Sequence, residues 1–171
     1  MNRWWLALPI AALVVTLAWT SWPATRLPPG THADRIVVHK ANRTLDLYSG
    51  GEIVRTYHVS LGRSPVGPKT QAGDGRTPEG NYRLDYRKLD SSFHRALHIS
   101  YPSAADISGA SARGVAPGGN VMVHGMKNRL GWIGRAHRLI DWTDGCVAVT
   151  DSEIEEILGA VPDGTPITIV P

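Results

Sequence analysis

The chain has 171 residues, with 18 Lys+Arg against 15 Asp+Glu, seven His and one Cys, Cys146. This length predicts one domain. The single Cys excludes an intramolecular disulfide and a Cys-rich zinc site. Arg3 and Arg26 are the only charged residues before position 33, so the remainder carries 16 basic (18 − 2) and 15 acidic residues. That balance argues against a nucleic-acid-binding face, while 42% hydrophobic residues predict a packed core.

The N-terminal segment is uncharged and apolar. Residues 4–19 read WWLALPIAALVVTLAW, with Arg3 just before them. Such a run is either a cleaved signal peptide or an uncleaved signal anchor. Trp at both ends is typical of a membrane-spanning segment, and no clean small-residue cleavage site follows, so an anchor over residues 1–22 is favoured. We expect a Pro-rich linker over 23–33 and an exported domain over 34–171. The domain is expected in the periplasm or cell envelope, anchored in the cytoplasmic membrane by residues 4–22.

The exported part is rich in short β-type runs separated by Gly, Pro and polar residues. Strands are expected at 35–40, 44–48, 52–60, 81–86, 98–101, 121–124, 146–149 and 167–170. Residues 62–78 read as a long loop. Short helices are expected within 102–113 and from Asp151, as the N-cap, to about Leu158. The sum is a mainly β domain with one or two short α-helices.

Two segments carry the residues suited to chemistry. His124 ends an apolar run and precedes Gly125, and Cys146 opens another run just after Gly145. A lone Cys together with a His elsewhere in the chain meets the basic requirement for a thiolate nucleophile, because the imidazole takes the thiol proton. The alternative is that Cys146 is a small buried hydrophobe and His124 a structural core histidine.

These segments resemble the signature of L,D-transpeptidase catalytic domains, the YkuD family, in which His-Gly is followed by a loop and Ser/Thr-x-Gly-Cys. Three further segments are similar to that family: Thr77-Pro-Glu-Gly-Asn-Tyr82, Tyr101-Pro102 and Pro117-Gly-Gly119. The resemblance covers residues 34–171. It implies a β-sandwich or barrel-like fold and a catalytic domain with those bounds.

The resemblance also implies a mechanism. Cys146 would attack the carbonyl of the third residue of a peptidoglycan stem peptide, and a thioester would form as the terminal D-Ala leaves. His124 would be the proton acceptor and donor, oriented by the backbone carbonyl of Gly125, and the Gly145 N–H would face the oxyanion. No metal and no organic cofactor are implied. Stem peptides and the membrane are the expected partners, nucleic acid is not, and the chain is expected to be a monomer.

Two positions near the candidate site depart from the family's common pattern. Ala148 stands where the family often has Arg, and Asp144 where it often has His or another polar residue. The loop from Lys127 to Arg138 is basic and has no acid before Asp141. We therefore expect Arg135 and Arg138 to bind stem carboxylates, with Trp142, Thr143 and Asp144 also contacting substrate. The alternative is that the basic residues form a solvated loop face.

Three other functions remain open at this point. The same Cys–His pair would support hydrolysis, as in an L,D-carboxypeptidase or endopeptidase. A zinc hydrolase would need His124 and His137 together with Cys146 or Asp141 as ligands, although the spacing has no HxxxH or CxxC pattern. A non-catalytic wall-binding module would leave the thiol and imidazole without a role.

Overall fold

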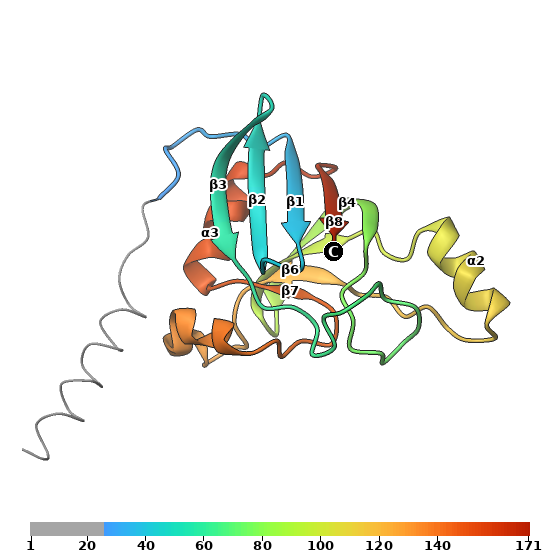
Figure 1. Ribbon diagram of the computed structural model, residues 1–171. Coiled ribbons are helices and arrows are strands. Elements are labelled where there is room, and N and C mark those ends of the chain that lie inside the picture. The colour runs from blue at the N-terminus through green and yellow to red at the C-terminus, as the bar shows by residue number, and fades with distance from the viewer. Residues whose placement is uncertain (1–25) are drawn as a thin grey trace, which may run out of the picture.

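The computed structural model describes residues 26–171, and its strands form one strongly curved sheet (Figure 1). Three strands, β1 (Arg35–His39), β2 (Thr44–Ser49) and β3 (Glu52–His58), make an antiparallel meander. The last strand, β8 (Pro166–Val170), pairs in parallel with β1 and antiparallel with β4 (Gly80–Ser91).

The second half of the sheet carries the candidate site. From β4 it continues through β5 (His94–Ile99), β6 (Met122–His124) and the short β7 (Val147–Ala148), giving the order β3-β2-β1-β8-β4-β5-β6-β7. The segment after β3 then returns to β7: Ser60 N donates to Ala148 O at 3.0 Å, and Ala148 N donates to Ser60 O at 2.8 Å. Because this contact joins the two ends of the strand order, the sheet closes around its core in a barrel-like arrangement.

Side-chain alternation along the strands separates the core from the site. Val121, just before β6, and Val123, within it, are buried in the core. Val147 in β7 and Val149 just after it are buried in the core as well. Residues between them therefore point to the opposite face. The core is completed by aliphatic side chains from the meander, β8 and the C-terminal helix α3 (Asp151–Ala160), among them Ile36, Leu45, Leu47, Ile154, Ile157 and Ile167.

Within residues 26–171, two α-helices and one 3₁₀ helix accompany the sheet. In α2 (Ala104–Ala112) the Ser103 side chain accepts from Asp106 N, and the Asp106 carboxylate accepts from Ser103 N. The expected N-cap of α3, Asp151, is wrong by one residue. Thr150 is the cap, because its side chain accepts from Glu153 N while the Glu153 carboxylate accepts from Thr150 N.

The 3₁₀ helix η2 (Gly131–Leu139) was not expected from the sequence. It has no side-chain cap, and Gly134 interrupts it with φ 50° and ψ −134°. A segment that has no capping residue and two glycines, Gly131 and Gly134, gives little sequence signal for a helix.

The mainly β expectation is confirmed, with one clear difference at β4 and β5. β4 runs to Ser91 instead of Tyr86, and β5 begins at His94 instead of His98. The extra length is a hairpin that extends beyond the core. Its exposed residues 85–90 are mostly polar, so apolar alternation does not reveal it.

The proposed anchor lies outside the described residues, as do linker positions 23–25. Linker residues 26–33 are described and form no helix or strand. Within 26–171 no helix has the length and apolar character needed to cross a membrane.

Candidate active site

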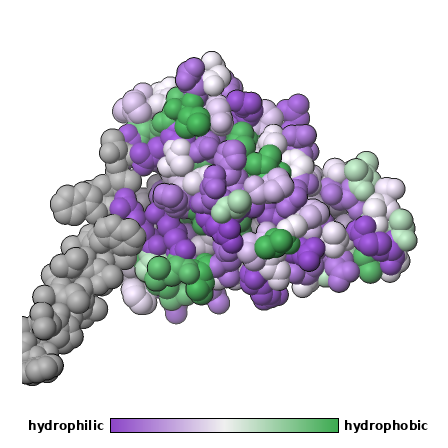
Figure 2. Space-filling view, in the orientation of Figure 1, coloured by the Kyte–Doolittle hydropathy of each residue, from purple (hydrophilic) through white to green (hydrophobic). Residues whose placement is uncertain are grey.

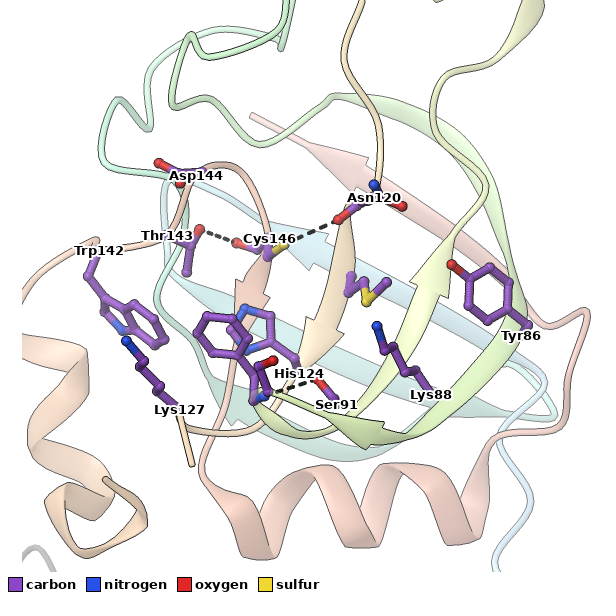
Figure 3. Close-up of a pocket in the computed structure, with 13 residues that line it drawn as sticks. Tyr86, Lys88, Ser91, Asn120, His124, Lys127, Trp142, Thr143, Asp144 and Cys146 are labelled. Carbon is purple, nitrogen blue, oxygen red and sulfur yellow. Dashed lines mark hydrogen bonds between the residues drawn. The ribbon is translucent and has the colours of Figure 1, made fainter. Parts of the chain in front are cut away.

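The strand register brings His124 and Cys146 to one face. β6 and β7 are parallel, with Val123 opposite Val147 and His124 opposite Ala148. One residue earlier the same register sets Met122 beside Cys146, so the side chains of Met122, His124 and Cys146 share the face opposite the core. They line a pocket of about 610 Å³ together with Tyr86, Lys88, Ser91, Ser92, Phe93, Asn120, Lys127, Trp142, Thr143 and Asp144 (Figure 3).

The imidazole of His124 is buried and oriented by the backbone. His124 is only 4% exposed, and its Nδ1 lies 2.6 Å from Gly125 O. A carbonyl oxygen only accepts, so Nδ1 carries the proton and Nε2 keeps a free lone pair. A Cβ on Gly125 would come within 2.8 Å of Asp151 Oδ1, so a side chain there would require the Asp151 carboxylate to shift. The Gly125 carbonyl thus orients the imidazole in this structure.

Aromatic rings enclose the imidazole. Phe93, in the two-residue turn between β4 and β5, has its ring 4.6 Å from that of His124, and the Trp142 ring is 5.7 Å away. Phe93 has no sequence signal of its own, because it lies at the end of the hairpin that apolar alternation does not reveal. Together the two rings shield the imidazole from water.

Burial determines the charge states of the two reactive groups. It lowers the pKa of His124 below the usual 6.5, although the hydrogen bond to Gly125 opposes this. Burial raises the pKa of the Cys146 thiol above the usual 9.0; Asp144 adds to the effect, while the Met122 N–H and Lys69 oppose it. At neutral pH the resting site therefore holds a neutral imidazole and a protonated thiol.

A tight turn presents Cys146 to the pocket. Thr143 Oγ1 donates to Cys146 O at 2.8 Å and accepts from Gly145 N at 3.1 Å. The Gly145 N–H, expected to face an oxyanion, is thus already engaged within the turn. Gly145 instead has a steric role, because its φ is +130° and a Cβ would lie 2.5 Å from Arg76 O. The thiol itself donates to Asn120 O at 3.7 Å.

The long loop 62–78 supports this turn from outside. Lys69 is buried there, and its Nζ lies 2.8 Å from Asp74 Oδ1. Burial opposes ionisation of Asp74, but hydrogen bonds from Lys69 and from three backbone amides lower its pKa to about 2. The fixed charge pair holds the loop, including Arg76 O, against Gly145. The sequence suggested only turns here, because a Lys–Asp pair five residues apart has no periodic signature.

The expected substrate-binding residues divide into two groups. Trp142, Thr143 and Asp144 line the pocket, and exposed Asp144 forms a 2.6 Å ion pair with Arg63. Arg138 is in the wrong place for that role, because η2 carries it onto α3, where Nη2 lies 2.6 Å from Glu153 Oε1. Arg135 is also on η2 and does not line the pocket.

Two lysines occupy the pocket instead of the arginines. Lys127 lies on one side of His124 and Lys88 on the other (Figure 3). Lys127 follows the His-Gly motif by two residues, so the sequence alone could have indicated that it lies near His124. Lys88 belongs to the solvent-facing end of β4, which had no sequence signal.

His137 has a structural environment. Ser60 Oγ donates to His137 O at 3.0 Å and lies 2.9 Å from His137 Nδ1. Because the Ser60 hydroxyl proton is used in the first bond, Nδ1 donates to Ser60 Oγ in the second. Asp141, the other ligand of the zinc alternative, accepts from Arg43 and from Leu61 N. Over residues 26–171 no three His, Cys, Asp or Glu side chains are grouped so as to hold a metal ion.

Acid should destabilise the fold through His137. Burial lowers the pKa of His137 to about 4 from the usual 6.5, with Arg138 adding to the effect. Between these values the unfolded chain binds the proton and the folded chain does not, so stability is present above pH 6.5 and is lost as pH falls to 4. We expect a loss of at most about 3 kcal/mol.

Urea unfolding of the wild type and His137→Asn at several pH values within that window measures this loss. Asn keeps a side-chain donor for Ser60 but does not titrate, so its stability should depend less steeply on pH. Equal slopes for the two proteins would contradict the assignment.

The chain is similar to known proteins both in sequence and in structure. The family model of the L,D-transpeptidase catalytic domain, YkuD, matches residues 33–169. The Escherichia coli (strain K12) protein named "Putative L,D-transpeptidase YafK" is 32% identical over 141 residues, which cover 77% of this chain and 50% of that protein. The chain thus spans about half the length of the curated relative it matches.

Solved structures share the fold. Pgp2, a helical cell shape determining protein of Campylobacter jejuni, superposes with a TM-score of 0.58 at 21% identity, over 90% of this chain and 53% of that one. Bd1075 of Bdellovibrio bacteriovorus gives 0.55 at 23% identity, over 86% and 52%. With the family model covering most of its length, the chain belongs to the YkuD family of L,D-transpeptidase catalytic domains.

Proposed function

We propose that this protein is a cysteine-dependent L,D-transpeptidase that acts on peptidoglycan stem peptides through a thioester on Cys146. One observation carries the proposal. A neutral imidazole, fixed through Nδ1 on Gly125 O, lines the same pocket as the chain's single thiol on the neighbouring strand. This combination supplies a nucleophile and a base without an acidic third residue, because the backbone carbonyl already fixes the tautomer.

The acylation step uses both groups. Cys146 Sγ attacks the carbonyl carbon of the third stem residue while its proton passes to Nε2 of His124. The tetrahedral intermediate then collapses, the C–N bond to the terminal D-Ala breaks, and the proton on His124 passes to the leaving amine. The products are D-Ala and a thioester on Cys146.

Resolution of the thioester reverses these roles. An amine of a second stem, or water, gives a proton to His124 as it attacks the thioester carbon. The Cys146–carbon bond breaks, and the thiol recovers its proton from His124. An amine acceptor gives a crosslink, and water gives a shortened stem.

The pocket charges suit an anionic donor. The only acid that lines the pocket, Asp144, is paired with Arg63, which leaves Lys88 and Lys127 facing the cavity. We propose that these lysines bind stem carboxylates in place of the arginine that Ala148 replaces. Ala148 is fully buried and has no polar group to offer.

Replacing both pocket lysines should weaken substrate binding. We expect Lys88→Met with Lys127→Met to raise KM about tenfold, the size of two exposed charge contacts, with a smaller effect on kcat. Steady-state kinetics on a stem tetrapeptide measure this change. Arg135→Met is the matched control, since Arg135 lies outside the pocket, and it should leave KM unchanged. A double lysine variant with wild-type KM would contradict the assignment.

Product analysis tests the reaction type. Mass spectrometry of tetrapeptide stems incubated with the protein should show crosslinked dimers and free D-Ala, both absent for Cys146→Ala. Stems that are only shortened would indicate the carboxypeptidase alternative, and release of material already attached to stems would indicate the endopeptidase alternative.

The proposed substrate also bears on location. Peptidoglycan stems lie outside the cytoplasm, so the proposal includes export to the cell envelope, with residues 4–22 as the membrane anchor.

A further inference from the structure

The loop between His124 and Cys146 exposes a group of large apolar side chains. Leu130, Trp132, Leu139 and Ile140, on and beside η2, are 37%, 78%, 81% and 67% exposed. Hydrophobic surface is gathered at the lower left of Figure 2, where Figure 1 places η2. We call these four residues, with Lys127, Arg129 and Arg135, the η2 patch.

A second cavity lies within the η2 patch. It has a volume of about 470 Å³ and is lined mainly by apolar side chains, including Met126, Ile133 and Ala136. It shares Lys127 and Trp142 with the pocket that holds Cys146. The patch therefore adjoins the candidate active site, and an apolar group that rests on it comes close to the pocket.

The charged side chains within the η2 patch have one sign. Residues 125–140 contain no acid, and Lys127, Arg129 and Arg135 form no ion pair within the described part of the chain. The acids on α3 are already engaged: Asp151, which lies beside Gly131, accepts from Met126 N, and the glutamates form ion pairs. Glu153 pairs with Arg138, Glu155 with Arg95 and Glu156 with Arg55. The patch thus presents apolar side chains flanked by free cations, which complements a surface of apolar chains and anionic headgroups.

The described chain begins near this patch. Leu27 N donates to Glu156 of α3, and Arg26 and Leu27 share a cavity with Glu153, the partner of Arg138 on η2. Figure 1 shows this start of the chain, α3 and η2 on the same side of the molecule. The apolar sequence 4–19 ends only six residues (20–25) before Arg26. If that sequence lies in a bilayer, the η2 patch lies within reach of its surface.

We infer that the η2 patch docks the domain on a bilayer surface that carries anionic headgroups. Trp132, Leu139 and Ile140 enter the interfacial layer, and the three cations contact headgroup phosphates. Docking sets the active-site pocket beside the membrane. The inference goes beyond the proposed reaction and does not depend on the chemistry of Cys146.

The single cysteine allows a direct test in the full chain. In a Cys146→Ala background, Leu139→Cys provides one labelling site for an environment-sensitive fluorophore. The matched control is Ile107→Cys, an apolar position 48% exposed on α2, at the opposite side of the molecule (Figure 1). Both proteins are reconstituted into vesicles of phosphatidylcholine alone or with phosphatidylglycerol.

In the anionic vesicles, we expect the fluorophore at position 139 to show a blue shift and quenching by headgroup nitroxides. The fluorophore at position 107 should show neither change. High salt should reverse the effect. Adding Arg129→Glu and Arg135→Glu should lower the docking equilibrium constant by about tenfold or more. Each cation near an anionic surface contributes about fivefold to that constant.

Three outcomes would overturn the inference. Position 139 could remain as solvent-exposed as position 107 in anionic vesicles. Its shift could be the same in neutral and anionic vesicles. It could also appear in detergent without vesicles and grow with protein concentration, which would identify a second copy of the chain as the occupant.

Discussion

Cys146→Ala should abolish turnover of stem peptides, lowering kcat/KM by about a thousandfold or more, because no other thiol exists in the chain to form the acyl intermediate. Ala fits the site, since it removes one atom from a side chain that is only partly buried at the pocket wall. Stability should therefore change by no more than about 1 kcal/mol.

Steady-state kinetics and thermal unfolding of the same preparation separate these effects. Loss of activity with an unchanged melting temperature supports the nucleophile assignment. An active Cys146→Ala protein would contradict it, and so would an inactive one that is unfolded while a folded Cys146→Ser variant keeps wild-type activity.

His124→Asn should lower kcat/KM by about a hundredfold to ten-thousandfold, the usual contribution of a general acid–base group. Asn was chosen because its amide nitrogen takes the place of Nδ1 and can donate to Gly125 O, so the local hydrogen bond is kept while the base is removed. The thiol should still react with iodoacetamide once pH exceeds its raised pKa. Wild-type turnover by this variant would contradict the assignment of His124 as base.

The pH profile of the same pair gives an independent readout. His124 acts as base only when neutral, and burial sets its pKa below 6.5, so the wild-type activity should fall on the acid side only below that pH. The alkaline fall should come above 9.0, where the thiol ionises without a proton for the leaving amine. His124→Asn should lose the acid limb. If the limb persists unchanged, another group is the base.

The resting charge states also predict thiol behaviour. A neutral pair should show no thiolate absorbance at pH 7, with absorbance appearing only as pH approaches or exceeds 9.0. A preformed thiolate–imidazolium pair would show it well below neutral pH.

Much of the fold was predictable because its strands obey period-two alternation. β1, β2 and β8 each place alternate apolar residues in the core, and Gly50-Gly51 marks the hairpin turn between β2 and β3. The end of β4 escaped because it lies beyond the core and has no buried face. A strand there is held by pairing with β5 and not by apolar burial.

The placement of His124 and Cys146 at one pocket was also predictable, for a local reason. His124 ends an apolar run and Cys146 begins one, and each lies beside a glycine. At such a position the end of a strand presents a polar side chain to a cleft. The residues that shape the pocket could not be found this way. Phe93 and Lys88 reach it through the β4–β5 hairpin, and the pairing that places them is long-range.

The arginine prediction failed because charge alone does not indicate direction. Arg135 and Arg138 lie in a basic loop, but η2 sets Arg138 against Glu153 on α3. Gly145 differs in another way. Its N–H is used by Thr143 and its missing side chain makes room for Arg76 O, so the glycine is required by packing.

The central claim is that Cys146 forms the acyl-enzyme, and intact mass spectrometry tests it most directly. The protein is incubated with a stem tetrapeptide or with a carbapenem, and the labelled peptide is identified after digestion. We predict a mass gain equal to the acyl group, located on Cys146 and absent from Cys146→Ala. Turnover without any adduct on Cys146, or an adduct on another residue, would contradict the account.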